Sequence, residues 1–117
     1  MTPVDFKART QAFALAVVRL VQNLPQTRTA QVIGNQLLRS GTSVGANYRA
    51  ACRGRSQKEF VAKLGIVEEE CDETLYWIEL LIEANILPKE QANHLLKEGN
   101  EILRMTISSI KTARAKR

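Results

Sequence analysis

The residues of this sequence that could do chemistry are mainly charged, and its bases and acids occupy different segments. Residues 39–63 hold a run of lysines and arginines with Glu59 as the only acid, and the last fourteen residues hold bases and no acid. Residues 64–85, in contrast, carry seven acids and no base. This segregation favours charge-complementary self-association, an anionic partner, or both.

Seven bases form a candidate nucleic-acid-binding set, because they lie near the expected join of the second and third helices or in the C-terminal basic run. They are Arg49, Arg53, Arg55, Lys58, Lys63, Lys111 and Arg114. Contacts between such bases and phosphates release counterions, so binding would weaken steeply with salt. The alternative is a solvated face or a set of salt bridges between subunits. Tyr48 is the one nearby ring that could stack on a nucleobase, and no recognition-helix pattern is visible, so we expect sequence-tolerant binding.

The sequence lacks the combinations of side chains that catalysis or metal binding needs. It contains no nucleophile beside a base, no phosphate-cradling glycine loop and no Glu-x-x-His pattern, and His94 is its only histidine. Cys52 and Cys71 stand outside any Cys-x-x-Cys pair, and we interpret both as reduced thiols. We therefore expect no catalytic residue, no bound metal and no cofactor.

Hydropathy gives no reason to expect a membrane partner. No stretch reaches the roughly 18 apolar residues of a membrane span, and the N-terminus has no long apolar run behind a basic start. The expected location is cytoplasmic.

Apolar residues recur at steps of three and four, which predicts four helices at about 3–23, 29–53, 56–85 and 88–114. Ser56 and Glu59 form a capping-box pattern for the third helix, Gly54 is the expected left-handed cap of the second, and Pro88 opens the fourth. The small residues around Ser43 and Gly45 predict a bend within one helix. Short turns then require an all-α, antiparallel up-down-up-down four-helix bundle as a single domain over residues 1–117.

Two further groups have structural interpretations. Arg39, Asn47 and Glu68 are expected to form a half-buried polar network that fixes helix register, with Glu70 as an alternative acid. Several large apolar residues lie off the main stripes and suggest a subunit interface between the first helix and the third helix of a neighbour, in a head-to-tail ring. These are Leu15, Val18, Ile66, Trp77 and Leu80. A wide core stripe is the alternative.

Residues 39–82 resemble the family called four helix bundle proteins, which are similar to proteins encoded in intervening sequences of large-subunit ribosomal RNA genes. The matching pieces are a base before a small-residue stretch, an Ala-Asn pair, an Arg-x-Arg-Ser-x-x-Glu-Phe segment and a Glu-Glu pair before an apolar seam. They are Arg39, Ser43, Ala46, Asn47, Arg53, Arg55, Ser56, Glu59, Phe60, Glu68, Glu69, Leu75, Trp77, Leu80 and Leu81. The sequence departs from the family at Gly45, where proline is frequent, and at residues 48–50, where Ile-Ala-Glu is usual.

One relative that this resemblance brings in is the accessory protein of diversity-generating retroelements, a basic pentamer linked to nucleic acid and a reverse transcriptase. The resemblance implies a four-helix fold, a homo-oligomer that is a pentamer, and a nucleic-acid role without catalytic residues. We therefore expect a non-enzymatic, homo-oligomeric scaffold that binds RNA or DNA through its basic surface. The alternative is an interaction module that docks a protein partner, with the charge segregation serving only self-assembly.

Overall fold

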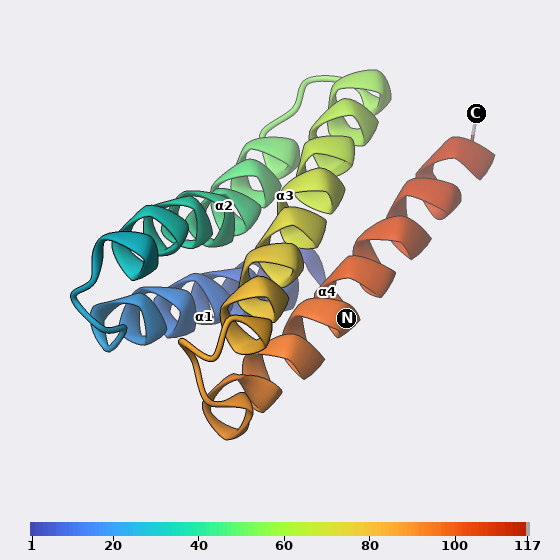
Figure 1. The fold of residues 1–117 in the computed structure, drawn as a ribbon. Helices are drawn as coiled ribbons and strands as arrows, with labels where there is room; N and C mark the ends of the chain where they lie inside the picture. The colour runs from blue at the N-terminus through green and yellow to red at the C-terminus, as the bar shows by residue number, and fades with distance from the viewer. Residues whose placement is uncertain (117) are drawn as a thin grey trace.

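The computed structural model describes residues 1–116, and these residues form four α-helices joined by short turns. The helices are α1 (Pro3–Gln22), α2 (Arg28–Cys52), α3 (Gln57–Glu83) and α4 (Lys89–Ala115) (Figure 1). Each begins and ends within two residues of the limits that the apolar periodicity predicts. The stretch around Ser43 and Gly45 lies inside α2, which continues through it as one helix.

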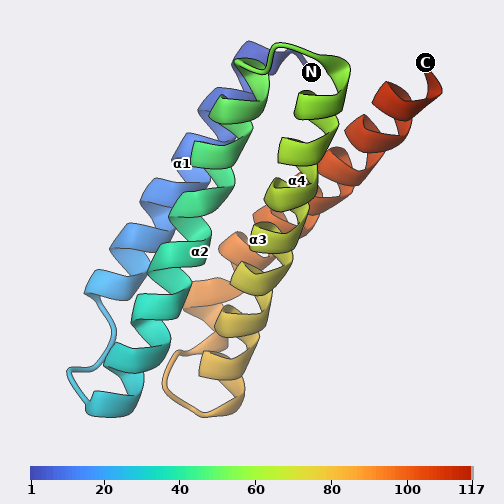
Figure 2. The same ribbon diagram turned by 90° about the horizontal axis from the view of Figure 1, so that it is seen from above.

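Consecutive helices run antiparallel, so the predicted all-α, up-down-up-down bundle is confirmed (Figures 1 and 2). Packing contacts join α1 to α2, α2 to α3, α3 to α4 and α4 to α1, whereas α1 and α3 lie diagonally across the bundle. The bundle measures 49 × 21 × 20 Å. Figure 2 shows the N-terminus, the α2–α3 turn and the C-terminal end of α4 at one end, and the other two turns at the opposite end.

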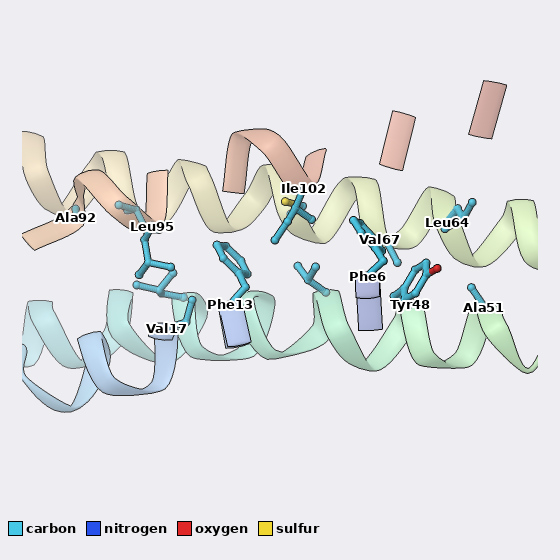
Figure 3. Packing of buried hydrophobic residues seen from close by; sticks show 14 of the residues in the cluster. Phe6, Phe13, Val17, Tyr48, Ala51, Leu64, Val67, Ala92, Leu95 and Ile102 are labelled. Carbon is cyan, nitrogen blue, oxygen red and sulfur yellow. The ribbon is translucent and has the colours of Figure 1, made fainter. Parts of the chain in front are cut away.

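One apolar core runs along the bundle, because every helix turns its periodic stripe inwards. Phe13 and Val17 of α1 meet Ile102 and Leu95 of α4 and the inner residues of α2 and α3 (Figure 3). Most of these side chains are at least nine-tenths buried, and each contributes roughly 1.5–3 kcal/mol when it is fully buried.

Close packing of α1 on α2 explains the small residues of α2. A Cβ at Gly41 would lie 2.7 Å from Cγ1 of Val17, and a Cβ at Gly45 would lie 3.3 Å from the carbonyl oxygen of Thr10. The glycines therefore let the two helices approach each other.

Local hydrogen bonds define where three of the helices begin. The side chains of Thr2, Thr27 and Ser56 accept bonds from the backbone N–H groups of the first turns of α1, α2 and α3. The capping box at Ser56 is only half formed, because the Glu59 carboxylate accepts from the N–H of Arg55. Pro88 precedes α4 as its N-cap residue, one position earlier than expected.

The predicted left-handed cap at Gly54 is wrong, and the left-handed residue lies elsewhere. Among the described residues no glycine has a positive φ, whereas Asn85 after α3 has a φ of 60°. There the N–H of Ile86 donates to the carbonyl of Leu81, and the N–H of Asn85 donates to that of Ile82. This is a Schellman ending, for which asparagine is the usual substitute for glycine.

Candidate nucleic-acid interface

The up-down topology brings all seven bases of the candidate set to one end of the bundle. We call this the basic end; it holds the starts of α1 and α3 and the ends of α2 and α4 (Figure 2). All seven side chains are exposed there. Within residues 1–116 no carboxylate lies within 4.0 Å of any of these bases, since the salt bridges of this part involve Arg9 and Arg39.

The acids at the basic end serve helix starts. Asp5 accepts bonds from the N–H and hydroxyl of Thr2, and these bonds lower the pKa of its carboxyl. Glu59 accepts from the N–H of Arg55. Both carboxylates are therefore engaged locally, so the surrounding lysines and arginines dominate the charge of this end.

Two of the seven bases line a groove between α1 and α2. Arg49 and Arg53 of α2 border it, and Lys7 and Gln11 of α1 face them from the other side. Ala14, Thr42, Gly45 and Ala46 complete its lining, and the hollow has a volume of about 430 Å³. We call it the α1–α2 groove. Lys7 is absent from the sequence-derived set. The predicted antiparallel bundle places the start of the first helix beside the end of the second, but it does not show that Lys7 borders the same hollow as Arg49 and Arg53.

The other five bases do not line this groove. Arg55 borders a second hollow at the α2–α3 turn together with Pro3, Ser56 and Phe60. Lys58 and Lys63 lie in the first turns of α3, and Lys111 and Arg114 lie in the last turns of α4. A bond from the Gln57 side chain to the carbonyl of Ala113 ties these two helix ends together.

The expectation that Tyr48 could stack on a nucleobase is wrong. Its ring is 7% exposed and packs edge-on against Phe6, with ring centroids 4.6 Å apart. Burial also raises the pKa of its hydroxyl. Tyr76, the exposed ring, is on α3 outside the basic end. The basic end therefore offers charges to a ligand and no exposed tyrosine.

The expected polar network forms only in part. Arg39 donates to Glu70 at 2.8 Å and to Glu73, and Glu73 also accepts from the Trp77 indole at 2.9 Å. The bonds from Trp77 and Arg39 lower the pKa of Glu73. Arg39 thus uses the alternative acid, Glu70.

Glu68 and Asn47 lie outside this network. Asn47 donates to the carbonyl and hydroxyl oxygens of Ser43 on its own helix, and Glu68 makes no hydrogen bond with any described residue. Glu68 lies two residues before Glu70, which rotates its side chain by about 200° around α3 and away from Arg39. Its assignment to the network was therefore wrong.

An ion-pair cluster between α1 and α4 is not among the sequence-derived sites. Arg9 donates to both carboxylate oxygens of Glu98, at 2.6 and 2.7 Å, and to Glu101 at 3.1 Å. Glu98 raises the pKa of the guanidinium, and Arg9 lowers that of the Glu98 carboxyl. The acids lie 89 and 92 positions after Arg9, so sequence spacing gives no indication of the cluster.

The expected interface residues differ in how far they reach solvent. Leu15 is 47% exposed and Ile66 is 37% exposed, whereas Val18, Trp77 and Leu80 are half-buried. Tyr76 adds a further exposed apolar surface beside Trp77. Their role between subunits stays a prediction.

The thiols and acids give no indication of other chemistry. Burial raises the pKa of the Cys71 thiol to about 12, and its Sγ lies 3.3 Å from the carbonyl oxygen of Gly99. Cys52 is half-buried and free. Across residues 1–116, no group of three or more histidines, cysteines and acids could hold a metal ion. In the same part of the chain, no helix combines the length and apolar character that crossing a membrane requires.

Comparisons with known proteins agree with this architecture. The family model of the 23S rRNA-intervening sequence protein matches residues 4–108. A crystal structure from Bacteroides thetaiotaomicron, described as a protein of unknown function from the S23 ribosomal protein family, has a TM-score of 0.88 and 38% sequence identity. The match covers 95% of this chain and 99% of that one. No curated protein matches the sequence. The chain belongs to the family of 23S rRNA-intervening sequence proteins.

Proposed function

We propose that the protein is a non-enzymatic, homo-oligomeric helical scaffold that binds nucleic acid through its basic end without marked sequence preference. The observation that carries this proposal is the gathering of exposed bases from all four helices at one end, with no ion-pair partner among the described residues. Bases that neutralise phosphates release condensed counterions, which supplies most of the affinity of sequence-independent binding.

The lack of sequence preference follows from the side chains at this end. Sequence is read mainly through contacts to base edges, whereas stacking of bases on aromatic rings tolerates any base. Tyr48 is buried against Phe6, so its ring is not available for stacking, and no recognition-helix pattern marks the sequence. Lysine and arginine contacts to the phosphate backbone remain, and they carry no sequence information.

Self-association is supported by apolar side chains on outer faces of the bundle. Leu15 on α1 and Ile66 on α3, two diagonal helices, are 47% and 37% exposed and stand outside the core cluster. Large exposed apolar groups commonly mark interfaces. A ring of five copies, which the family resemblance implies, would place several basic ends on one assembly and raise its avidity for a long polyanion.

Light scattering during size exclusion, with and without a mixed pool of RNA and DNA at two salt concentrations, tests the proposal. We expect a pentamer that elutes together with nucleic acid at low salt and is free of it at high salt. A monomer that ignores nucleic acid would overturn both parts. An oligomer that ignores it would favour the protein-docking alternative.

Two triple variants separate the basic end from net charge. R49A/R53A/R55A removes three positive charges from the basic end, and R19A/R28A/K89A removes three exposed charges from the other end. We expect the first variant to lose retention on heparin and the second to keep most of it. Equal losses would show that retention follows net charge alone.

A further inference from the structure

We propose that the α1–α2 groove is the phosphate-binding site at which the basic end holds the sugar–phosphate backbone of its nucleic acid, an inference that rests on the proposed function. The groove brings together bases from two helices. Lys7 and Gln11 lie one turn apart on α1, as do Arg49 and Arg53 on α2. Because α1 and α2 run antiparallel, the start of α1 faces the end of α2, and all four side chains border one hollow.

The charges of this groove are unbalanced within the described chain. Arg9 and Arg39, the other arginines in the middle of α1 and α2, each engage two carboxylates. Lys7, Arg49 and Arg53 have no carboxylate within 4.0 Å among residues 1–116, although they share one hollow. These three bases therefore give the groove a net positive charge, which attracts an anion.

The floor of the groove gives a ligand access to these charges. Ala14, Gly45 and Ala46 place no long side chain between the two basic walls. Gly45 favours the close packing, since a Cβ there would lie 3.3 Å from the Thr10 carbonyl oxygen. The two helices thus meet closely and leave a shallow channel above their contact.

The chemistry of the lining fits a phosphodiester. Arginine forms paired hydrogen bonds with phosphate oxygens, lysine contributes a point charge, and the amide of Gln11 supplies an uncharged donor. No aromatic side chain lines the groove, so it offers no surface on which a base could stack. The site would therefore bind the backbone of RNA or DNA whatever the sequence.

A matched pair of substitutions tests this placement. Ala46→Glu puts a carboxylate in the groove, and Ala62→Glu puts one on exposed α3 at the same end, between Lys58 and Lys63. The two variants have the same net charge. With a fluorescent mixed-sequence oligonucleotide at fixed low salt, we expect A46E to weaken binding by about tenfold or more and A62E to weaken it by only about twofold. Equal losses would overturn the proposal, because charge spread over the whole end would then explain the binding.

If A46E fails to fold, as judged by its helical circular dichroism, a second pair of variants tests the groove as the binding site. Lys7→Gln and Lys116→Gln each remove one exposed lysine from the basic end, and Lys116 lies neither in the groove nor in the candidate binding set. We expect K7Q to reduce the slope of log K against log salt by about 0.7–0.9, the contribution of one phosphate contact, and K116Q to leave it closer to the wild-type value. An unchanged slope in K7Q would overturn the groove as the site.

Failure of the groove and failure of the proposed function give different results. Wild-type protein that binds the oligonucleotide, with equal losses in both members of each pair, contradicts the groove and keeps the function. Wild-type protein that binds no oligonucleotide contradicts both. Calorimetric binding of inorganic phosphate without oligonucleotide binding would identify a small-anion site and also overturn the proposal.

Discussion

Arg9 and Glu98 form a paired hydrogen bond between α1 and α4, which pack on each other less extensively than the other neighbouring helices. Both side chains are about four-fifths buried, so the pair is shielded from solvent more than an ordinary surface pair. The same guanidinium also donates to the sulfur of Met105, at 3.2 Å. The cluster therefore fixes how α4 lies against α1, and its loss should loosen this side of the bundle first.

Acid should weaken this pair in a definite pH window. The bonds from Arg9 hold the pKa of Glu98 below its ordinary value of 4.5. The stabilisation is therefore complete above pH 4.5, and it is lost as the pH falls through the lower pKa of the folded state. We expect E98Q to cost about 1 kcal/mol near neutral pH and to flatten the acid limb of stability. Urea unfolding from pH 6 to pH 3 at fixed protein concentration measures this.

Glu69→Gln is the matched control, because Glu69 is exposed and has no hydrogen-bond partner among residues 1–116. It should leave the acid limb as steep as that of the wild type. An E98Q protein with an unchanged acid limb would mean that other carboxyls govern acid unfolding.

At the scale of the helix, Gly41 of α2 and Gly65 of α3 both lie inside helices and have opposite environments. A Cβ at Gly41 would lie 2.7 and 2.8 Å from the two Cγ atoms of Val17, which is fully buried and cannot move aside. A Cβ at Gly65 meets nothing within 4 Å. We therefore expect G41A to destabilise the fold by about 1–3 kcal/mol through overpacking. G65A should stabilise it by up to about 1 kcal/mol through helix propensity.

Urea unfolding of the two alanine variants at equal protein concentration gives the comparison. A G41A protein as stable as G65A would contradict the close approach of α1 and α2. The same approach forms the floor of the α1–α2 groove, so G41A tests the packing beneath the candidate site without touching its charges.

The helices could be predicted from the sequence because apolar periodicity and turn residues are local signals. The conformation at helix ends is harder to predict. Gly54 suggests a left-handed cap, yet α2 ends without one. Asn85 adopts the left-handed conformation after α3 instead. A glycine permits a positive φ and does not require it. The positive φ at Asn85 accompanies bonds from the N–H groups of Asn85 and Ile86 to the carbonyls of Ile82 and Leu81.

The candidate site could be predicted only in part. The sequence shows which segments are charged, but which side chains face one another depends on how the helices pack. Arg49 and Arg53 follow from the basic segment, whereas Lys7 joins them only through the packing of α1 on α2. From the sequence, Tyr48 is expected to offer its ring for stacking on a nucleobase, but in the fold the ring packs against Phe6. Glu68 differs from Glu70 by two positions, and that rotation decides which of them reaches Arg39.

At the scale of the whole molecule, the positions of α1 and α3 determine what kind of assembly they could form. The two helices are diagonal and their backbones are not neighbours, so their outer faces look in opposite directions. A contact between α1 of one copy and α3 of the next therefore joins two different surfaces. Such head-to-tail contacts propagate until the rotation closes a ring, whereas a symmetric dimer would use the same surface twice.

Two interface variants that fail separately should complement each other when mixed. Leu15→Glu spoils the α1 face and leaves α3 intact, and Ile66→Glu does the reverse. We expect each variant alone to be a monomer in light scattering, because a buried carboxylate without a partner is strongly unfavourable. Their mixture should form a heterodimer, since one intact α1 face meets one intact α3 face and no further copy can add.

Val32→Glu, at a 56% exposed position of α2, should leave the wild-type ring unchanged. An I66E protein that still assembles, or a mixture that stays monomeric, would show that the contact between α1 and α3 does not build the oligomer.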